Sequence, residues 1–382
     1  MVRPDRAGEG ELYFPLHAWV CDRCLLVQLE SFQEPADIFS EYTYFSSYSD
    51  SWLEHARRYS AAVIERFKLA ADSFAVEVAS NDGYLLKNFV AANIPCIGIE
   101  PARNVAEAAR AAGVSTLVEF FGEALARRLA DKGKMADLII ANNVLAHVPM
   151  LNDFVAGLKI LLKPEGVITV EVPHILNLIS NTQFDTIYHE HFCYFSLTTL
   201  RGIFQRHGLR VFDVQELPTH GGSLRLFVCR EGGGHREIQT VETTARKEQD
   251  FGLGELATYR DFGPKVRRVK LDLMRFFVEA AAAGARIACY GAAAKGNTLL
   301  NYCGIGKDLI EFAVDRSPHK QGLLLPGTRI PVYGPERVDF EKPDYLLILP
   351  WNLKDEIIGQ MQQIRAWGGR FVVPIPRLEI ID

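Results

Sequence analysis

Residues 74–83 read Phe-Ala-Val-Glu-Val-Ala-Ser-Asn-Asp-Gly, an apolar run that ends in turn-forming residues. Such a run is typical of a buried strand that enters a turn. The next helix is expected to begin near Tyr84. A strand, a turn and a helix in this order open a doubly wound α/β domain, where a ligand can lie against backbone N–H groups at the helix start. The sequence therefore predicts an α/β fold with a ligand site at this turn.

Short apolar runs recur after this stretch at helix-length intervals, which predicts parallel sheets covered by helices. The first set of strands is expected at 74–78, 96–99, 138–141 and 167–172, closed by an antiparallel pair at 211–217 and 224–229. The second set is preceded by one long helix at 241–283 and is expected at 286–290, 310–314, 345–349 and 370–373. We therefore predict two Rossmann-like α/β units.

The chain upstream of the first strand has a different character. It is rich in aromatic residues and has little clean periodicity, except for an amphipathic helix expected at 52–67. Three successive glycines at 232–234 mark a flexible boundary between the two α/β units. We predict a small irregular N-terminal cap at 1–68, a first α/β domain at 69–235 and a second at 236–382.

Composition limits the partners and the compartment. The 382 residues carry a net charge of −5, without the basic excess that nucleic-acid binding needs. The most apolar window, 276–294, is interrupted by Glu279 and Arg286, so no membrane span is predicted. The first dozen residues are charged and lack the apolar core of a secretion signal, so a cytoplasmic protein is expected. No obligatory protein partner is evident, and seven scattered cysteines argue against a disulfide framework.

The turn after the first strand predicts a nucleoside site. Ala79 and Ser80 stand where a dinucleotide fold would have glycines, so a nucleoside without a pyrophosphate, such as S-adenosylmethionine, fits better. Glu100 ends the second strand and can accept both hydroxyls of a ribose, while Asn142 adds a polar group at the third strand end. The alternative is that any doubly wound domain has an acidic strand end and a turn. The candidate cofactor residues are Glu77, Ser80, Asn81, Asp82, Gly83, Glu100 and Asn142.

The densest reactive cluster is Tyr188-His189-Glu190-His191, in an apolar surround. Neither a helix nor a strand can aim all four side chains inward, so we predict a loop with Tyr188 and His191 pointing into a cleft and His189 in a structural role. Burial beside other polar groups moves a pKa, which suits acid–base catalysis. The alternatives are a metal site, which lacks ligands, and a hydrogen-bonded core cluster.

Further candidates lie at other strand ends and turns. His147 follows the third strand, and His220 with Gly222 lies in the turn of the antiparallel pair; a core histidine and simple turn chemistry are the respective alternatives. Lys295 and Asn297 follow the first strand of the second unit, where small residues let a backbone approach a ligand. The Gly and Lys spacing does not match a Walker A loop, so ATP hydrolysis is not indicated.

Cys21 and Cys24 have the spacing of a zinc knuckle. A structural zinc site needs two more ligands, and the chain contains no second Cys-x-x-Cys. Zinc is therefore doubtful.

Taken in order, these motifs make the chain resemble the deoxysugar C-methyltransferases, which act on nucleotide-linked 4-keto-6-deoxysugars, commonly at C-3′. The likeness covers essentially 12–382, and the motif Phe-Asp-x-x-Tyr-x-Glu-His-Phe at 184–192 is its most specific part. The resemblance implies a zinc-binding N-terminal domain, a class I S-adenosylmethionine domain and a C-terminal Rossmann-like domain. It assigns catalysis to His191, Tyr188, Glu190 and His147, and the cofactor to the loop 77–83 and Glu100. Tyr44 is a further candidate for the cofactor, and the candidates for the sugar nucleotide are His220, Gly222, Lys295 and Asn297.

The sequence departs from the family in two places. Members usually carry a first Cys-x-x-Cys upstream of the one at 21–24, so either zinc has been lost or the start is truncated. Ala79 stands where a glycine is common in class I loops, which narrows the space near the methionine moiety.

The residues permit one mechanism in particular. A ketone at C-4 makes the C-3 hydrogen acidic, and His191 removes that proton. Tyr188 or His147 donates a hydrogen bond to the enolate oxygen, and Glu190 orients the base or balances its charge. The carbanion then attacks the sulfonium methyl, and no metal is required. The alternatives are an O- or N-methyltransferase on another small acceptor, or a non-catalytic sugar-nucleotide binding protein.

Overall fold

Strand β3 (Ala75–Val78), which the opening stretch predicts, is buried along its whole length. It lies inside a seven-stranded sheet of order β5-β4-β3-β6-β7-β10-β9, in the computed structural model, which describes residues 1–39 and 45–382. Strand β3 pairs in parallel with both neighbours, so the sheet reverses its winding there and places a crevice at the carboxyl ends. The other strands are β4 (Cys96–Ile99), β5 (Thr116–Leu117), β6 (Ala136–Asn142), β7 (Leu162–Pro173), β9 (Leu209–Leu217) and β10 (Ser223–Arg230).

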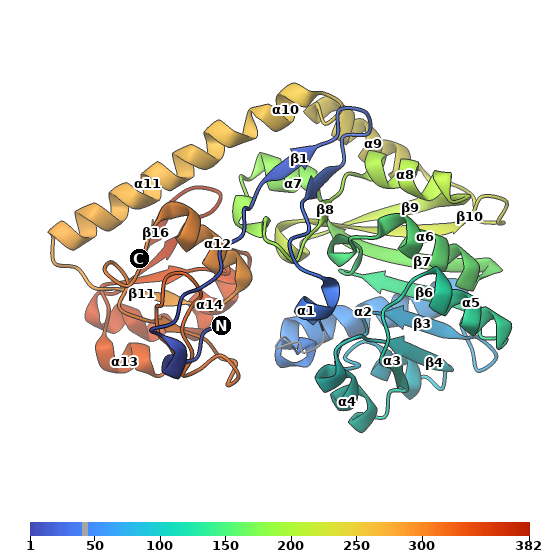
Figure 1. The fold of residues 1–382 in the computed structure, drawn as a ribbon, viewed down its shortest axis with the longest axis horizontal. Helices are drawn as coiled ribbons and strands as arrows, with labels where there is room; N and C mark the ends of the chain where they lie inside the picture. The colour runs from blue at the N-terminus through green and yellow to red at the C-terminus, as the bar shows by residue number, and fades with distance from the viewer. Residues whose placement is uncertain (40–44) are drawn as a thin grey trace.

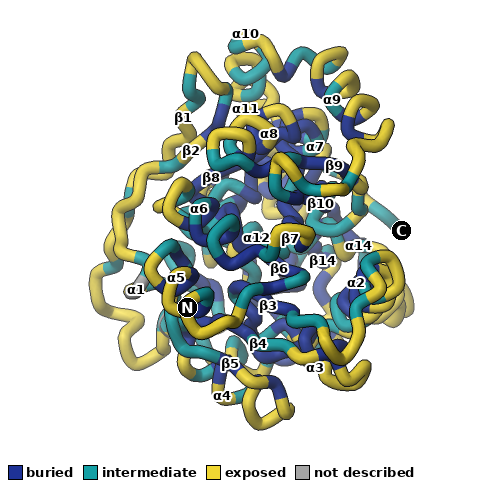
Figure 2. Tube along the Cα trace, turned by 90° about the vertical axis from the view of Figure 1, so that its right-hand side faces the viewer, coloured by how far each residue is buried: buried dark blue, intermediate teal, exposed yellow. Residues whose placement is uncertain are grey.

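Helices cover this sheet, and β9 and β10 close it as the predicted antiparallel pair (Figure 1). The predicted helix at 52–67 is present as α2 (Asp50–Phe67), whose first turn is capped by Ser49. The remaining helices of this lobe are α3 (Leu86–Ala91), α4 (Arg103–Ala111), α5 (Glu123–Asp131), α6 (Leu151–Leu161), α7 (Ile175–Ser180) and α8 (Leu197–Arg206). Buried residues concentrate on the central strands and exposed ones on the outer helices (Figure 2).

The C-terminal lobe is a second, smaller α/β unit, as predicted. Its six-stranded sheet has the order β13-β12-β11-β14-β15-β16, and only the edge strand β16 runs antiparallel. Its strands are β11 (Ile287–Tyr290), β12 (Ala313–Val314), β13 (Val332–Tyr333), β14 (Tyr345–Ile348), β15 (Arg370–Val373) and β16 (Glu379–Ile381). Its helices are α12 (Ala294–Cys303), α13 (Arg337–Glu341) and α14 (Lys354–Gln360). The predicted fold class, two Rossmann-like units, is confirmed.

The single long helix predicted at 241–283 is wrong. Three helices, α9 (Gln239–Phe251), α10 (Leu256–Arg260) and α11 (Phe262–Ala282), bridge the two lobes instead (Figure 1). Helix α9 ends because Gly252 adopts a left-handed conformation, with φ of 88°, and its N–H closes the last turn.

The N-terminal segment is less irregular than predicted. Strands β1 (Ala18–Val20) and β2 (Val27–Leu29) form a hairpin, and β2 pairs with β8 (Cys193–Tyr194), directly after the loop that holds the reactive cluster. Helix α1 (Pro35–Phe39) follows the hairpin. Hydrophobic alternation is too short in these strands to be recognised in the sequence.

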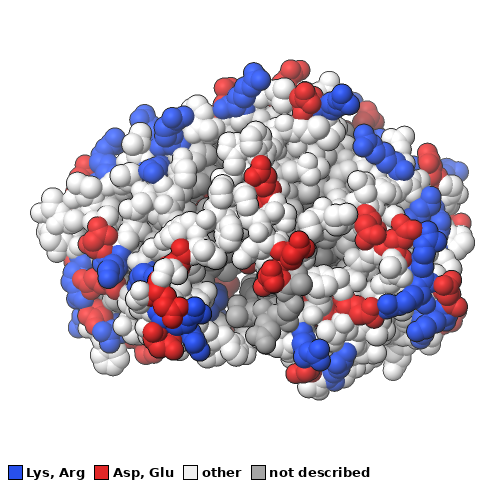
Figure 3. Space-filling view, viewed as in Figure 1, with Lys and Arg blue, Asp and Glu red and all other residues white. Residues whose placement is uncertain are grey.

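The surface shows no dominant sign of charge on the face in Figure 3. Acidic and basic side chains alternate over the outer parts of both lobes, and the surface between the lobes is mostly uncharged (Figure 3). Within residues 1–39 and 45–382, no helix is both long and apolar enough to cross a membrane.

A buried hydrogen-bond network around Glu248 fastens bridging helix α9 to the first lobe. Glu248 is 1% exposed, accepts a hydrogen bond of 2.8 Å from His174 Nε2 and caps α8 through the backbone N–H groups of Leu197 and Thr198. Burial raises the pKa of Glu248, but the hydrogen bonds from His174 and Thr198 outweigh it, so the net pKa is lowered. The carboxylate therefore stabilises the fold at neutral pH.

We expect Glu248→Ala to lower the free energy of unfolding by about 3–5 kcal/mol, because it strands a buried histidine and uncaps α8. Chemical denaturation measures this loss. Since the folded-state pKa is lowered, the wild-type advantage is present above the unfolded pKa and fades as the pH falls through the folded value. Glu242→Ala on the same helix removes exposed contacts with Arg246 and Gln239 and should cost less than about 0.5 kcal/mol. Equal losses would contradict the assignment.

Candidate functional site

The loop after β3 forms a tight cradle at the carboxyl edge of the sheet. Ala79 and Asn81 adopt left-handed conformations, with φ of 56° and 48°, and Gly83 has φ of 77°. A Cβ on Gly83 would lie 2.9 Å from Cγ2 of Val114, so only glycine fits there. Ala79 holds its conformation in spite of its Cβ, which accommodates the departure from the family pattern.

Glu100 lies beneath this cradle, as the sequence predicts. Its two carboxylate oxygens accept hydrogen bonds of 2.9 Å from the backbone N–H groups of Asn81 and Ala102. Burial raises the pKa of Glu100, and these two N–H groups oppose that shift. Each oxygen keeps a further lone pair, so the carboxylate can still accept a pair of ribose hydroxyls.

Several buried polar atoms around the cradle have no hydrogen-bond partner among the described residues. They are Glu77 Oε2, Ser80 Oγ, Asp82 Oδ1 and Asn142 Oδ1. Burial, helped by the charges of Glu100 and Asp82, raises the pKa of Glu77 well above its usual range. Buried polar groups normally find partners, so these orphaned atoms fit a polar ligand such as the amino-acid end of S-adenosylmethionine.

Two serines that the sequence reasoning missed cover the cradle. The Ser46 N–H donates to Asn81 Oδ1 at 2.9 Å, and Ser47 donates to Asp82 Oδ2 from its N–H at 3.0 Å and its hydroxyl at 2.6 Å. No spacing rule points to these serines. Tyr44, the neighbouring residue predicted from the family resemblance, lies outside the described residues.

The predicted reactive cluster is a loop, and it brings Tyr188 and His191 together. Tyr188 Oη lies 3.0 Å from His191 Nε2. The His191 ring also donates to the carbonyl of Thr186, which can only accept. His191 Nε2 is therefore the unprotonated nitrogen and accepts from the Tyr188 hydroxyl.

His147 packs against this pair, with 4.7 Å between the ring centroids of His147 and His191. Its ring donates to the carbonyl of Glu190, while Nδ1 has no partner among the described residues. Burial lowers the pKa of His147 to about 4, and burial, with smaller contributions from His147, His220 and Lys295, lowers that of His191 well below its ordinary value. Both rings are neutral bases at pH 7.

The other two members of the cluster have backbone contacts. His189 Nε2 lies 3.1 Å from the carbonyl oxygen of Pro15, which agrees with a structural role. Glu190 contributes its carbonyl to His147. These two contacts thus hold the middle of the loop against the N-terminal segment and against His147, which follows the third predicted strand.

His220 joins the site from the turn between β9 and β10. Burial and the charge of Lys295 lower its pKa to about 3. The Gly222 N–H donates to Thr219 within the turn, and a Cβ on Gly222 would lie 2.3 Å from Nδ2 of Asn177. Gly222 therefore shapes the turn and its N–H is bonded within it, while its assignment to the sugar nucleotide stays a prediction.

Lys295 and Asn297 reach the site from helix α12 of the C-terminal lobe. Lys295 Nζ donates to Asn352 Oδ1 at 3.1 Å, and burial lowers the lysine pKa while Asp185 opposes the shift. Asn297 Oδ1 is buried without a partner among the described residues. The charge of Lys295 lowers the pKa values of both His191 and His220, so this cation is electrostatically linked to the histidine cluster.

Asp185 and Trp351 were missed by the sequence reasoning. Trp351 Nε1 of the C-terminal lobe donates to Asp185 Oδ2 at 2.7 Å. Burial raises the Asp185 pKa to about 6, against the opposing effects of Lys295 and Trp351. The motif Phe184-Asp185 was visible in the sequence, but nothing there indicated its partner.

A second buried network was also missed. Glu171, which is 1% exposed, accepts from Arg225 Nε at 2.7 Å and lies 3.0 Å from His55 Nε2. His55 stacks on Trp52, whose ring meets the edge of His220 at 5.2 Å. This network supports the His220 side of the site.

Cys21 and Cys24 form the turn of the β1–β2 hairpin. The N–H groups of Cys24 and Arg23 lower the pKa of Cys21, as in a metal knuckle. Within 1–39 and 45–382, however, no group of three or more His, Cys, Asp or Glu side chains could hold a metal ion. Two thiolates do not complete a tetrahedral zinc site.

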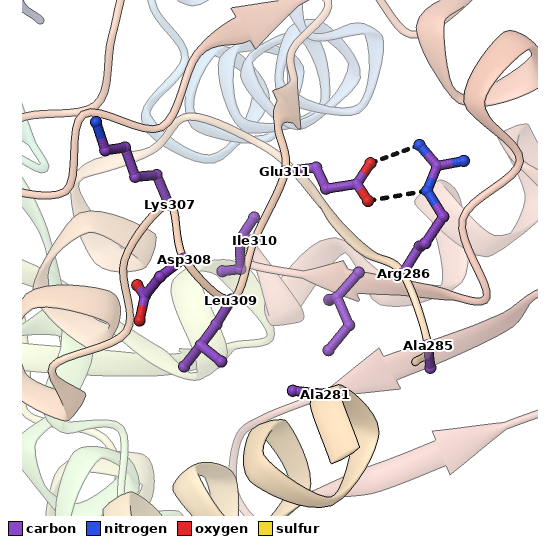
Figure 4. Close-up of a pocket in the computed structure, with 9 residues that line it drawn as sticks. Ala281, Ala285, Arg286, Lys307, Asp308, Leu309, Ile310 and Glu311 are labelled. Carbon is purple, nitrogen blue, oxygen red and sulfur yellow. Dashed lines mark hydrogen bonds and ion pairs between the residues drawn. The ribbon is translucent and has the colours of Figure 1, made fainter. Parts of the chain in front are cut away.

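A surface pocket at the amino end of β11 is separate from this site. It has a volume of about 110 Å³ and is lined in part by the ion pair between Arg286 and Glu311 (Figure 4). Ligand pockets are typically about 300–1,000 Å³. Lys295 and Asn297 follow the opposite end of the same strand, so the pocket plays no part in the candidate site.

Comparison with known proteins agrees with this geometry. Residues 52–214 match a family described as a methyltransferase domain, 218–376 match the C-methyltransferase C-terminal domain, and 1–39 match a domain whose description names zinc binding. The chain is 39% identical over 378 residues to the C-methyltransferase NovU of Streptomyces niveus, covering 99% of this chain and 90% of that protein.

Solved structures with some likeness are also methyltransferases. The magnesium protoporphyrin IX methyltransferase of Synechocystis PCC 6803 with bound S-adenosylmethionine is 13% identical, with a TM-score of 0.36 over 47% of this chain and 79% of that chain. The 1,6-didemethyltoxoflavin-N1-methyltransferase of Burkholderia thailandensis is 16% identical, with a TM-score of 0.37 over 54% of this chain and 94% of that chain. The assignment rests on the sequence match over nearly the whole chain: this protein belongs to the C-methyltransferase family and is an S-adenosylmethionine-dependent enzyme.

Proposed function

We propose that this enzyme methylates a carbon next to the ketone of a nucleotide-linked 4-keto-6-deoxysugar, with C-3′ as the favoured position. The single observation that carries the proposal is the pair of neutral bases, buried His191 and half-buried His147, beside a phenol and the cofactor cradle. A carbon acceptor must lose a proton before it can attack a methyl group. An acid–base cluster of this kind supplies that step.

The proposed first step is removal of the proton on the α carbon. His191 Nε2 carries the lone pair that takes this proton, while the C–H electrons move to the adjacent carbonyl oxygen as an enolate. The Tyr188 hydroxyl, released from Nε2, donates to that oxygen. The N–H of His147 could take this role only by leaving the Glu190 carbonyl that it now bonds. Glu190 orients the loop and balances the charge of the protonated base.

The second step would transfer the methyl group: the carbanion carbon would bond to it as its bond to sulfur breaks, and S-adenosylhomocysteine would leave. S-adenosylmethionine, when bound, supplies a methyl group already activated on a sulfonium. The cradle of Glu77, Ser80, Asn81, Asp82 and Gly83, with Glu100 on the ribose and Asn142 beside it, orients that methyl group, and Tyr44 stays a candidate for the same role. The protonated His191 then returns its proton to solvent.

The position of Lys295 beside the histidine cluster favours a substrate that carries a diphosphate. Its charge lowers the pKa of His191 in the free protein. A diphosphate paired with Lys295 would offset that charge and make His191 a stronger base when the substrate binds. Asn297 and His220 would bind the same substrate. The proposed domains are a cap at 1–68, a cofactor domain at 69–235 and a C-terminal domain at 236–382 that contributes to substrate binding.

We expect Glu100→Ala to weaken S-adenosylmethionine binding by about 1–3 kcal/mol, because the ribose loses a charged hydrogen-bond partner. Calorimetry measures the affinity, and Glu100→Gln, which keeps one acceptor for the loop N–H groups, should lie between the wild type and Ala. Glu107→Ala, at an exposed position of α4, is the matched control. Unchanged affinity in both Glu100 variants would remove this residue from the cofactor site.

We expect His191→Asn to lower kcat by roughly 10²–10⁴-fold while leaving cofactor affinity nearly intact, as loss of a general base does. In deuterated water with S-adenosylhomocysteine, wild-type enzyme should exchange the hydrogen on a carbon next to the C-4 ketone, and the variant should not. Proton NMR reads C-3 and C-5 separately, since the ketone acidifies both. Exchange at C-5 alone would indicate that the enzyme methylates C-5 and not C-3.

The control for this test is His189→Asn, on the same loop but bonded to Pro15. If His191 is the base, this variant should exchange the substrate hydrogen within about threefold of the wild-type rate, because it leaves the His191 ring in place. A His191 variant that exchanges and methylates at the wild-type rate would leave His147 or Tyr188 as the base.

We expect the purified chain to hold well under one tightly bound zinc ion, because Cys21 and Cys24 supply only two ligands. Elemental analysis after gel filtration measures the metal. A full equivalent that disappears in Cys21→Ser would show that further ligands complete the site.

A further inference from the structure

Trp351 belongs to the C-terminal lobe but contacts the loops that carry the proposed catalytic residues. It begins the short helix η6 (Trp351–Leu353), just beyond the carboxyl end of β14, and is 8% exposed. Its ring lies 5.0 Å from Lys295 Nζ, and its Nε1–H donates to the buried carboxylate of Asp185. A hydrogen bond to a buried, charged acceptor is among the stronger side-chain interactions.

The first loop that Trp351 contacts leads to His191. Asp185 is the middle residue of the short helix η4 (Phe184–Thr186) and is completely buried. The next residue, Thr186, provides the carbonyl that accepts from the His191 ring. The indole therefore fixes the Asp185 carboxylate, and the next residue, Thr186, fixes the ring of the proposed base through its carbonyl.

The second loop carries His220. A Cβ on Gly221 would lie only 2.5 Å from Cη2 of Trp351, so the backbone next to His220 packs directly on the indole. Gln183 Nε2 donates to the Gly221 carbonyl at 2.8 Å and ties this loop to the first one. One side chain thus supports both loops.

The packing of η4 points to the same coupling. Phe184 is buried in the apolar core of the C-terminal lobe, and its ring centroid lies 5.1 Å from that of Tyr302 on α12. The segment before the catalytic loop is therefore held by the C-terminal lobe, although its neighbours in sequence belong to the first lobe. Its position depends on where that lobe sits.

From these contacts we infer that Trp351 is a positioning residue for methyl transfer, which sets the place of His191 through Asp185 and that of His220 through Gly221. The inference rests on the proposed function in one respect, the role of His191 as base. The C-terminal lobe then completes the catalytic geometry as well as holding substrate.

The charge of Asp185 provides an independent readout. Lys295 and Cys303 face it from α12, and the Trp351 indole faces it from η6. The indole N–H favours the ionised carboxylate, so its removal raises the Asp185 pKa further. If the ionised form holds the loop, the acid limb of the kcat profile moves to higher pH when the indole N–H is lost.

The test is Trp351→Phe, which keeps an aromatic ring beside Gly221 and Lys295 but removes the N–H. The matched control is Trp367→Phe in the same lobe, where the indole donates only to the Pro343 carbonyl, at 3.1 Å. We expect Trp351→Phe to lower kcat roughly 10- to 100-fold with KM within about threefold, because misplacing a base costs rate rather than binding. The acid limb of its kcat profile should move upward, and Trp367→Phe should match the wild type.

Amide hydrogen exchange gives a readout that needs no sugar substrate. Peptides covering 183–192 should exchange faster in Trp351→Phe than in the wild type or Trp367→Phe. If they do, and wild-type enzyme ignores every keto-sugar nucleotide, the proposed substrate fails while the positioning role stands. If wild-type enzyme uses such a sugar and Trp351→Phe changes neither the exchange, kcat nor the pH profile, the inference is wrong.

Discussion

The site depends on one constraint, the burial of imidazole rings where a positive charge is costly. Burial is the largest contribution that lowers the pKa values of His147, His191 and His220. A solvated histidine would be partly protonated near neutral pH and would lose the lone pair that a base needs. The surrounding carbonyls and hydroxyls fix which nitrogen carries the proton, so the fold determines both the charge and the direction of each base.

Two sheets are needed to bury such a cluster. The carboxyl ends of the first sheet supply the cofactor cradle and His147, and the loops that follow them would be exposed if nothing covered them. The C-terminal lobe provides that cover with Lys295, Asn297 and Trp351, while β2 of the N-terminal hairpin holds the chain just after His191. Polar groups so enclosed must find partners in the protein or in a ligand, and the unpartnered atoms of Glu77, Ser80 and Asp82 in the cradle fit a ligand there.

Much of this architecture could be predicted from the sequence, because buried strands and strand-end residues leave local patterns. The strands around Glu77 and Glu100 and the loop position of His191 follow from hydrophobic runs and turn residues. The pairing of Asp185 with Trp351 joins residues 166 positions apart and leaves no periodic signal. A glycine that shapes a turn and one that binds a ligand look alike in sequence, as Gly222 illustrates. The predicted long bridging helix is interrupted where Gly252 adopts a left-handed conformation and ends α9.

Electrostatics link the two ends of the proposed substrate. Lys295 lies near enough to help lower the pKa values of His191 and His220, and the carboxylate of Asp185 partly balances the lysine charge. Burial lowers the pKa of His191 with any acceptor, and an anionic group at Lys295 would remove only the part of the lowering that this cation adds. Binding energy at the diphosphate would thereby assist proton removal at the sugar. In that case the bases would strengthen only when the correct substrate fills the site, which would favour a charged nucleotide sugar over a small neutral ketone.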